Sequence, residues 1–222
     1  MSNFSKEIYN KKKRRLIGEL IEPAEIKTDK AWLSIHKSSK DDLLTYESSG
    51  LVVSINGSGT LPMEHHQCEE AGKLAQFVHA QKGIVMNGGR SSGVMGTSTI
   101  AADKQQAGII FPELEKEKMI RGEKVVVNSP QPRIELLATC TPVIVIFRGG
   151  LGTLMILMRS IVHIRNREFH PDQLPQMVFV SNYWIGLLST MMNMDTLPKE
   201  FLKELKFFNS ASEVISNLPT NK

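Results

Sequence analysis

TPVIVIFRGGLGTLMILMRS, residues 141–160, joins a continuous apolar run to a glycine-rich turn and then to a segment with helical spacing. The run VIVIF at 143–147 shows no alternation of apolar and polar residues, which is typical of a strand covered on both faces. Strands that alternate with helices are the units of α/β proteins. This segment therefore predicts a parallel sheet flanked by helices.

The same unit recurs along the chain from residue 51 onward. We expect strands at residues 51–56, 83–87, 108–111, 124–127, 142–147, 176–180 and 206–208. We expect helices at residues 62–82, 93–106, 132–139, 152–165, 183–192 and 210–217. Ser210 and Glu213 have the spacing of a capping box for the last of these helices. The alternation as a whole predicts a doubly wound α/β sheet.

Residues 1–49 differ from the rest by their polar, lysine-rich composition. We expect them to form a basic, partly helical N-terminal extension before a domain that spans residues 50–222. Residues 1–15 carry a net charge of +5, and because the whole chain carries +4, the remainder carries −1. A solvated arm is the favoured interpretation of the KKKRR run at 11–15, and binding of nucleic acid through it is the less favoured one.

Composition narrows the class of protein. The chain has 222 residues, of which 41% are hydrophobic and 23% charged, as in ordinary globular proteins. No apolar run approaches the roughly 20 residues of a membrane-spanning helix, and the N-terminus lacks the apolar core of a secretory signal. We therefore expect a cytoplasmic protein with no membrane partner.

Cys68 and Cys140 have no partners at zinc-ligand spacing, so we expect buried free thiols.

Three glycine-rich turns follow predicted strands, namely NGSGT at 56–60, GGRSSGVMG at 88–96 and RGGLGT at 148–153. Open α/β sheets bind ligands at the carboxyl ends of their strands, and the N–H groups of a helix N-terminus favour a phosphate there. None of the turns has the Lys-Ser or Lys-Thr of a P-loop, and the strict GxGxxG spacing is missing. The turns therefore predict a small, phosphate-bearing ligand held by the backbone.

A metal site is the less favoured interpretation of a second motif. His65 and His66 with Glu69 and Glu70 form two His/Glu pairs at i, i+4, a spacing that suits a metal on a helix. No third ligand is evident, so a polar helix face is favoured. We expect no metal and no required cofactor, and a nucleotide or another phosphate-bearing molecule as the bound ligand.

These motifs resemble the Lonely Guy (LOG) family, formerly described as lysine decarboxylase-like, from residue 51 to the C-terminus. The matching elements are NGSG at 56–59, GGRSSGVMG at 88–96, Arg133, and GGLGT at 149–153. The resemblance implies an α/β, Rossmann-like, doubly wound, mostly parallel sheet flanked by helices, usually in a homodimer. Many members are hydrolases of the N-glycosidic bond, nucleoside 5'-monophosphate phosphoribohydrolases that act on cytokinin riboside monophosphates or AMP. Related Rossmann-like proteins carry the molybdenum cofactor, which also bears a phosphate.

The resemblance also implies a set of ligand-binding residues. They are Gly57, Ser58, Gly88, Gly89, Gly93, Met95, Gly96, Arg133, Gly149, Gly150, Gly152 and Thr153. The family motif PGGxGTxxE ends in a catalytic Glu, and this chain has Ile156 at that position and Met155 before it. A carboxylate stabilises the positive charge that develops on the sugar and positions water, and isoleucine does neither. We therefore expect weakened or lost hydrolysis, with Arg133 as the catalytic residue if activity survives.

Several alternatives stay open from the sequence. The chain is a nucleotide-binding protein without efficient hydrolysis, an active hydrolase with a relocated carboxylate, or an interaction module that uses its basic arm. Glu135 is the less favoured replacement base, because two residues on a helix turn the side chain by about 200° from Arg133. Arg148 stands where the family has Pro. It contacts a di- or triphosphate or an acidic partner, or it is a solvated surface residue.

Overall fold

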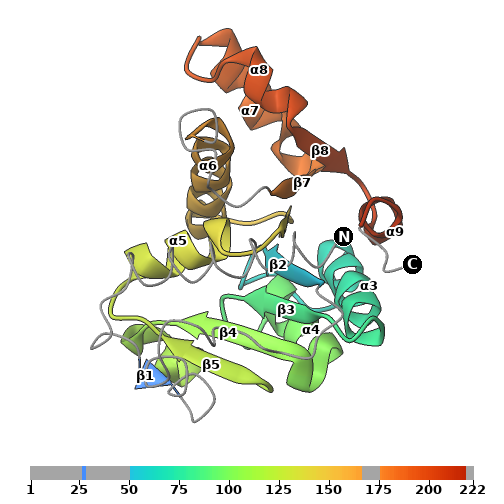
Figure 1. Cartoon of the computed structure of the whole chain (residues 1–222), viewed down its shortest axis with the longest axis vertical. Helices are drawn as coiled ribbons and strands as arrows, with labels where there is room; N and C mark the ends of the chain where they lie inside the picture. The colour runs from blue at the N-terminus through green and yellow to red at the C-terminus, as the bar shows by residue number, and fades with distance from the viewer. Residues whose placement is uncertain (1–26, 29–50, 167–175, 219–222) are drawn as a thin grey trace, which may run out of the picture.

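Valine and isoleucine dominate the central strands, and these strands are shielded from water. Strands β2 (Val52–Asn56) and β6 (Val143–Ile146) are buried at every position. β-branched side chains favour strands that are packed on both faces. The structure, a computed structural model, describes residues 27–28, 51–166 and 176–218, and Figure 1 shows how they are arranged.

Within these residues, eight strands form one sheet in the order β1-β5-β4-β3-β2-β6-β7-β8. The other strands are β1 (Lys27–Thr28), β3 (Ile84–Asn87), β4 (Gln106–Ile110), β5 (Glu123–Val126), β7 (Met177–Ser181) and β8 (Leu205–Phe208). Neighbouring strands are parallel except β1 and β5, which are antiparallel. The predicted α/β, Rossmann-like, mostly parallel sheet is thus confirmed.

Helices cover both faces of this sheet (Figure 1). One layer consists of α3 (His66–Ala80), α4 (Gly93–Ala102) and α9 (Ala211–Ser216), which share an apolar core with strand residues such as Val53 and Ile55. The opposite layer consists of α5 (Pro130–Thr139), α6 (Leu151–Asn166), α7 (Ile185–Asn193) and α8 (Lys199–Lys203). Its core includes Leu136, Leu157 and Leu188. The doubly wound arrangement follows from these two separate cores.

The order of the strands reverses between β2 and β6. From β2 the chain proceeds through β3 and β4 to β5, and it then crosses back to place β6 on the other side of β2. β2 pairs in parallel with both neighbours, and its last residue, Asn56, lies opposite Ile146. This reversal is the topological switch point, where open α/β sheets bind ligands beyond the carboxyl ends of the strands.

The structure corrects the predicted boundaries around residue 103. The expected helix 93–106 ends at Ala102, because Asp103 adopts a left-handed backbone with φ 48°. The expected strand 108–111 begins earlier, at Gln106, which is buried and donates from Nε2 to Asn87 Oδ1 at 3.0 Å. In the sequence, Gln105 and Gln106 are compatible with the end of a helix. Gln106 lies in a strand instead, where its buried side-chain amide has Asn87 as its hydrogen-bond partner.

Two short elements were missing from the prediction. They are a 3₁₀ helix at Pro112–Glu117 and the helix α8, and each begins at or directly after a proline. The expected partly helical extension lies outside the described residues, except for the two residues of β1. Among the described residues, no helix is both long enough and apolar enough to cross a membrane.

A buried carboxylate attaches the last helix to the sheet domain. Glu70 on α3 accepts a hydrogen bond from the Ala211 amide at the N-terminus of α9 (2.6 Å) and another from Lys73 Nζ (2.6 Å). Burial alone would raise the pKa of Glu70. The Lys73 ammonium and the Ala211 amide outweigh burial and hold the pKa below its ordinary value of 4.5.

A pKa that is lowered by folding makes stability depend on pH in a defined direction. The stabilisation from Glu70 is complete above pH 4.5, the ordinary value, and is lost as pH falls through the lowered pKa of the folded state. We predict that the free energy of unfolding falls more steeply below pH 4.5 in the wild type than in Glu70→Gln. Urea titrations over a pH series measure this. The exposed neighbour Glu69, changed to Gln, is the control and should keep the wild-type slope.

Candidate functional site

Hydrogen bonds join the turn after β2 to the turn after β3. The Ser58 carbonyl accepts from the Val94 amide at the start of α4 (2.8 Å), and the Ser92 hydroxyl donates to the Gly59 carbonyl (2.5 Å). Gly93 has φ +62°, and a Cβ there would lie 2.2 Å from the Ser58 oxygen. The glycine is therefore required for packing between the two turns, and the Val94 amide at the N-terminus of α4 is already occupied.

Ser58 also bonds across the switch point. Its amide donates to the Arg148 carbonyl after β6 (2.8 Å), and its hydroxyl accepts from the amides of Thr60 (3.1 Å) and Leu61 (3.2 Å). The sequence predicted Ser58 as a ligand contact. The structure places it at the predicted site, but its amide, carbonyl and hydroxyl oxygen already have partners within the protein.

Asn87 fixes the turn after β3. Its side-chain nitrogen donates to Ser98 Oγ (3.1 Å) and Thr99 Oγ1 (2.9 Å) on α4, and its oxygen accepts from the Gly89 amide (2.9 Å). Gly89 has φ +68°, which side chains rarely adopt. The turn is thus held by a fully buried amide that sequence analysis did not single out.

The first three amides of α6 are all open, whereas one of the first three amides of α4 is bonded. The first hydrogen bond of α6 runs from the Leu154 amide to the Gly150 carbonyl (2.9 Å), so the amides of Leu151, Gly152 and Thr153 have no partner among the described residues. Unpaired amides at a helix N-terminus attract an anion, and the helix dipole adds to this attraction. At the N-terminus of α4, by contrast, the Val94 amide is bonded to Ser58, and the amides of Gly93 and Met95 are the ones without a partner among the described residues.

Two glycines beside these amides have no structural reason to be glycine. A Cβ at Gly150 or at Gly152 would meet nothing within 4 Å, and neither residue has a positive φ. At Gly149, by contrast, a Cβ would lie 2.1 Å from the Thr153 hydroxyl. Among the described residues, no atom lies within 4 Å of a Cβ at Gly150 or Gly152, which allows close approach of a ligand to the backbone.

Arg133 lies at the same edge of the sheet, in the first half of α5. Its Nε donates to the Ile109 carbonyl (2.8 Å) and one terminal nitrogen donates to the Gly88 carbonyl (2.8 Å), at the ends of β4 and β3. Burial, together with the smaller effect of the charge on Arg90, lowers the pKa of Arg133 to about 10. The guanidinium is still charged at neutral pH, and no carboxylate pairs with it among the described residues.

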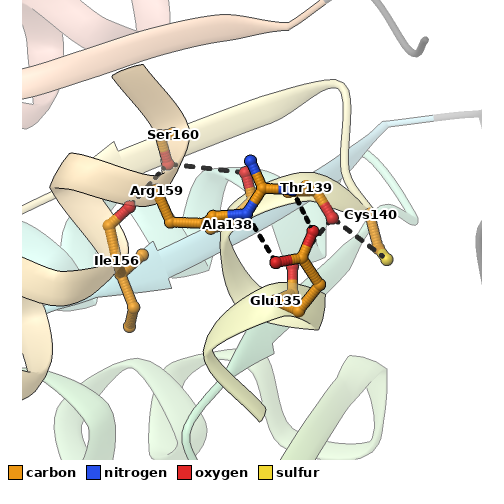
Figure 2. A network of polar contacts seen from close by, with 7 residues as sticks. All are labelled: Glu135, Ala138, Thr139, Cys140, Ile156, Arg159 and Ser160. Atoms are coloured by element: carbon orange, nitrogen blue, oxygen red, sulfur yellow. Dashed lines mark hydrogen bonds and ion pairs between the residues drawn. The ribbon is translucent and has the colours of Figure 1, made fainter. Parts of the chain in front are cut away.

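The position of the family glutamate is closed. Ile156 is 5% exposed and packs in the core between the sheet and the α5–α6 layer. Figure 2 shows it pointing away from the polar contacts of the next turn, where Arg159 of α6 lies against Glu135 of α5. Arg159 Nε donates to Glu135 Oε2 at 2.5 Å, and a terminal nitrogen donates to the other oxygen. The carboxylate nearest to Arg133 in sequence is therefore bound in a bidentate ion pair.

Other predicted residues have structural roles. His65 caps α3 by accepting from the Gln67 amide at Nδ1 (3.1 Å), and no group of three metal ligands occurs in the described part of the chain. Both cysteines are buried thiols that form no disulfide in the described part of the chain, as predicted. Met95 and Gly88 lie against the Arg133 guanidinium, and Gly96 packs on the Ser91 carbonyl.

The site also contains residues that the sequence analysis missed. Gln67 Oε1 accepts from the Arg148 amide (3.2 Å) and from the Ser181 hydroxyl (3.1 Å), which joins α3 to the ends of β6 and β7. Asn56, at the end of β2, is 2% exposed, and its Oδ1 has no hydrogen-bond partner among the described residues. Asn56 begins the NGSG motif at 56–59, and the half-buried Gln67 lies in no motif, so only their positions in the fold identify the roles of their side chains.

Apolar side chains are exposed on α6, on α7 and on residues next to α7. They are Leu151, Met155, Val162, Tyr183, Ile185, Leu187 and Met194. The homodimer that the sequence resemblance implies stays a prediction.

Comparison with known proteins identifies the fold. No family model matches the sequence, and no curated protein matches it. The structure is similar to the molybdenum cofactor binding protein from the phototrophic bacterium Rippkaea orientalis, with 18% identity, 74% of this chain and 93% of that chain covered, and a TM-score of 0.55. It is similar to the molybdenum cofactor carrier protein from Chlamydomonas reinhardtii, with 15% identity, the same coverage and a TM-score of 0.55. A third similar structure, TM1055, has 15% identity, coverage of 74% and 96%, and a TM-score of 0.51.

The Glu135–Arg159 pair gives a test of what holds α5 against α6. Both side chains are largely shielded, with 13% and 29% of their surface exposed, so removing one leaves the other without its partner. We predict that Arg159→Leu lowers the free energy of unfolding by about 1–3 kcal/mol, less than for a fully buried pair. Urea denaturation measures the change. The double variant Glu135→Leu/Arg159→Leu should lose less than the single variant, and an equal loss would contradict a role for the ion pair.

Proposed function

We propose that this chain binds a small molecule that carries a phosphate group, at the carboxyl edge of the sheet. The observation that carries the proposal is the open N-terminus of α6, where three amides lack partners among the described residues and Gly150 and Gly152 face free space. Such a helix terminus binds phosphate through N–H groups and dipole together. Arg133 adds a buried positive charge at the same edge.

We propose further that hydrolysis of an N-glycosidic bond is weak or absent. Cleavage needs a carboxylate near the sugar, but Ile156 is packed in the core and Glu135 is held by Arg159. The ligand is then kept rather than consumed. A nucleotide fits this description. So does the molybdenum cofactor, which two structurally similar proteins bind or carry and whose phosphate the α6 amides would hold.

A pair of glycine substitutions tests the binding site. Gly152→Ala should leave the free energy of unfolding unchanged within about 1 kcal/mol, because the methyl meets no atom and alanine favours a helix. It should weaken binding of AMP or inorganic phosphate about tenfold, since the methyl points toward the helix N-terminus where the anion sits. Calorimetric titration and urea denaturation measure the two effects.

Gly93→Ala is the matched control for this experiment. It places a side chain at φ +62° against the Ser58 carbonyl, so it should destabilise the fold by more than about 1 kcal/mol. Unchanged phosphate affinity in Gly152→Ala would contradict a site at the N-terminus of α6. The same conclusion would follow if neither AMP nor inorganic phosphate bound to the wild type at millimolar concentration.

An assay of base release tests the loss of hydrolysis. After long incubation with a panel of nucleoside 5'-monophosphates, including AMP and a cytokinin riboside monophosphate, we expect intact nucleotides by chromatography. Release of base and ribose 5-phosphate that disappears in Arg133→Ala would contradict this and establish an active phosphoribohydrolase. Arg133 also bonds two backbone carbonyls, so circular dichroism must show that the variant is folded.

A further inference from the structure

Arg148 combines a fixed backbone with an exposed side chain. Its amide donates to Gln67 Oε1 (3.2 Å) and its carbonyl accepts from the Ser58 amide (2.8 Å), so the residue is held on both sides of its Cα. The side chain is exposed, and its guanidinium carbon lies 5.1 Å from the centre of the Tyr183 ring. No carboxylate pairs with it among the residues that the structure describes. The Arg148 guanidinium thus lies over the half-exposed ring of Tyr183, two residues after the end of β7.

This charge directly precedes the open helix terminus. Gly149 and Gly150 separate Arg148 from the first residue of α6. Thr153 in the first turn is 6% exposed, its hydroxyl faces the Gly149 turn, and this hydroxyl has no hydrogen-bond partner among the described residues. The α6 amides therefore have a hydroxyl donor in the same turn, and the Arg148 guanidinium belongs to the residue two positions before the cap of the helix.

From this arrangement we propose that the ligand contains two linked phosphate groups. The first binds the α6 amides and the Thr153 hydroxyl, and the second binds the Arg148 guanidinium. The proposal rests on the proposed function, which requires only the first phosphate. A planar guanidinium binds phosphate oxygens in a bidentate manner, and such charge-assisted bonds are stronger than contact with an exposed ring. If the ligand had only one phosphate, bound at the helix terminus, the Arg148 guanidinium would keep its contact with the Tyr183 ring and would bind no phosphate.

The rest of the edge has the charge that a diphosphate ligand requires. Arg133 bonds carbonyls at the ends of β4 and β3, and the Arg90 side chain passes beside Gly59, after β2. Arg148 lies on the other side of the switch point, after β6. Neighbouring strands are about 4.8 Å apart, so β3 and β6, two steps apart in the sheet, are separated by about 10 Å. Positive groups thus flank the switch point on both sides, which suits a nucleoside diphosphate or a dinucleotide better than a monophosphate.

Calorimetric titration of the full chain with two matched pairs of ligands tests the proposal. ADP should bind about tenfold more tightly than AMP, and pyrophosphate more tightly than inorganic phosphate, because one additional charge-assisted contact forms. Arg148→Gln should bring the ratio of the affinity for ADP to the affinity for AMP close to one. Arg148→Lys should restore part of the ratio, since it keeps the charge and loses the planar fork.

A control variant and the contrary results complete the test. Arg121→Gln removes an exposed arginine at the opposite edge of the sheet, paired with Asp103, and should keep the wild-type ratio. Equal affinity for ADP and AMP, or an unchanged ratio in Arg148→Gln, would overturn the diphosphate proposal while leaving phosphate binding intact. Failure of all four compounds to bind would overturn the proposed function as well.

Discussion

The hydrogen bonds of Ser58 join the turns at the carboxyl edge of the sheet, where we propose that the ligand binds. The Ser58 amide binds the Arg148 carbonyl on one side of the switch point, and the Ser58 carbonyl binds the Val94 amide on the other. Because one residue joins the turns after β2, β3 and β6, these turns form a single surface. These hydrogen bonds also affect the two helix N-termini. The Val94 amide of α4 donates to the Ser58 carbonyl, whereas no group of the described residues accepts from the first three amides of α6.

The chemistry of this edge follows from charge. An enzyme that cleaves a ribosyl bond must place negative charge against a developing cation, and a binding protein for phosphate must place positive charge against an anion. In this chain the carboxylate position is Ile156, packed in the core, and Glu135 is neutralised by Arg159. Arg133 is charged and has no carboxylate partner in the described residues. These features are the basis for our proposal that an anionic ligand is retained and not hydrolysed.

Much of the fold could be predicted from the sequence because both strand and turn signals are local. Continuous apolar runs such as VIVIF identify buried strands, and glycines after them mark the three turns. Polar residues inside the fold were harder to place. Gln106 was predicted to be helical, and its place in a strand depends on a distant partner, Asn87. The helix α8, only five residues long, is too short for a periodic pattern to reveal it.

The sequence predicted the three turns of the candidate site. It did not predict which turns bond to each other and which one keeps unbonded amides. All three turns have the same glycine signal, and only the hydrogen-bond partners show that two are occupied with each other. A sequence likewise does not show that a glycine has free space before it, as Gly150 has, or that Ser58 is already fully bonded. Gln67 and Tyr183 reach Arg148 from other elements, so no motif contains them.

Backbone amide resonances, followed during a titration with inorganic phosphate, test the α6 site most directly. If phosphate binds there, the amide signals of Leu151, Gly152 and Thr153 should shift saturably, and those of Ser58 and Val94 should stay nearly unchanged because they are bonded within the protein. Shifts confined to the α4 terminus, or none at the α6 terminus at millimolar phosphate, would contradict the claim that the open N-terminus of α6 is the phosphate site.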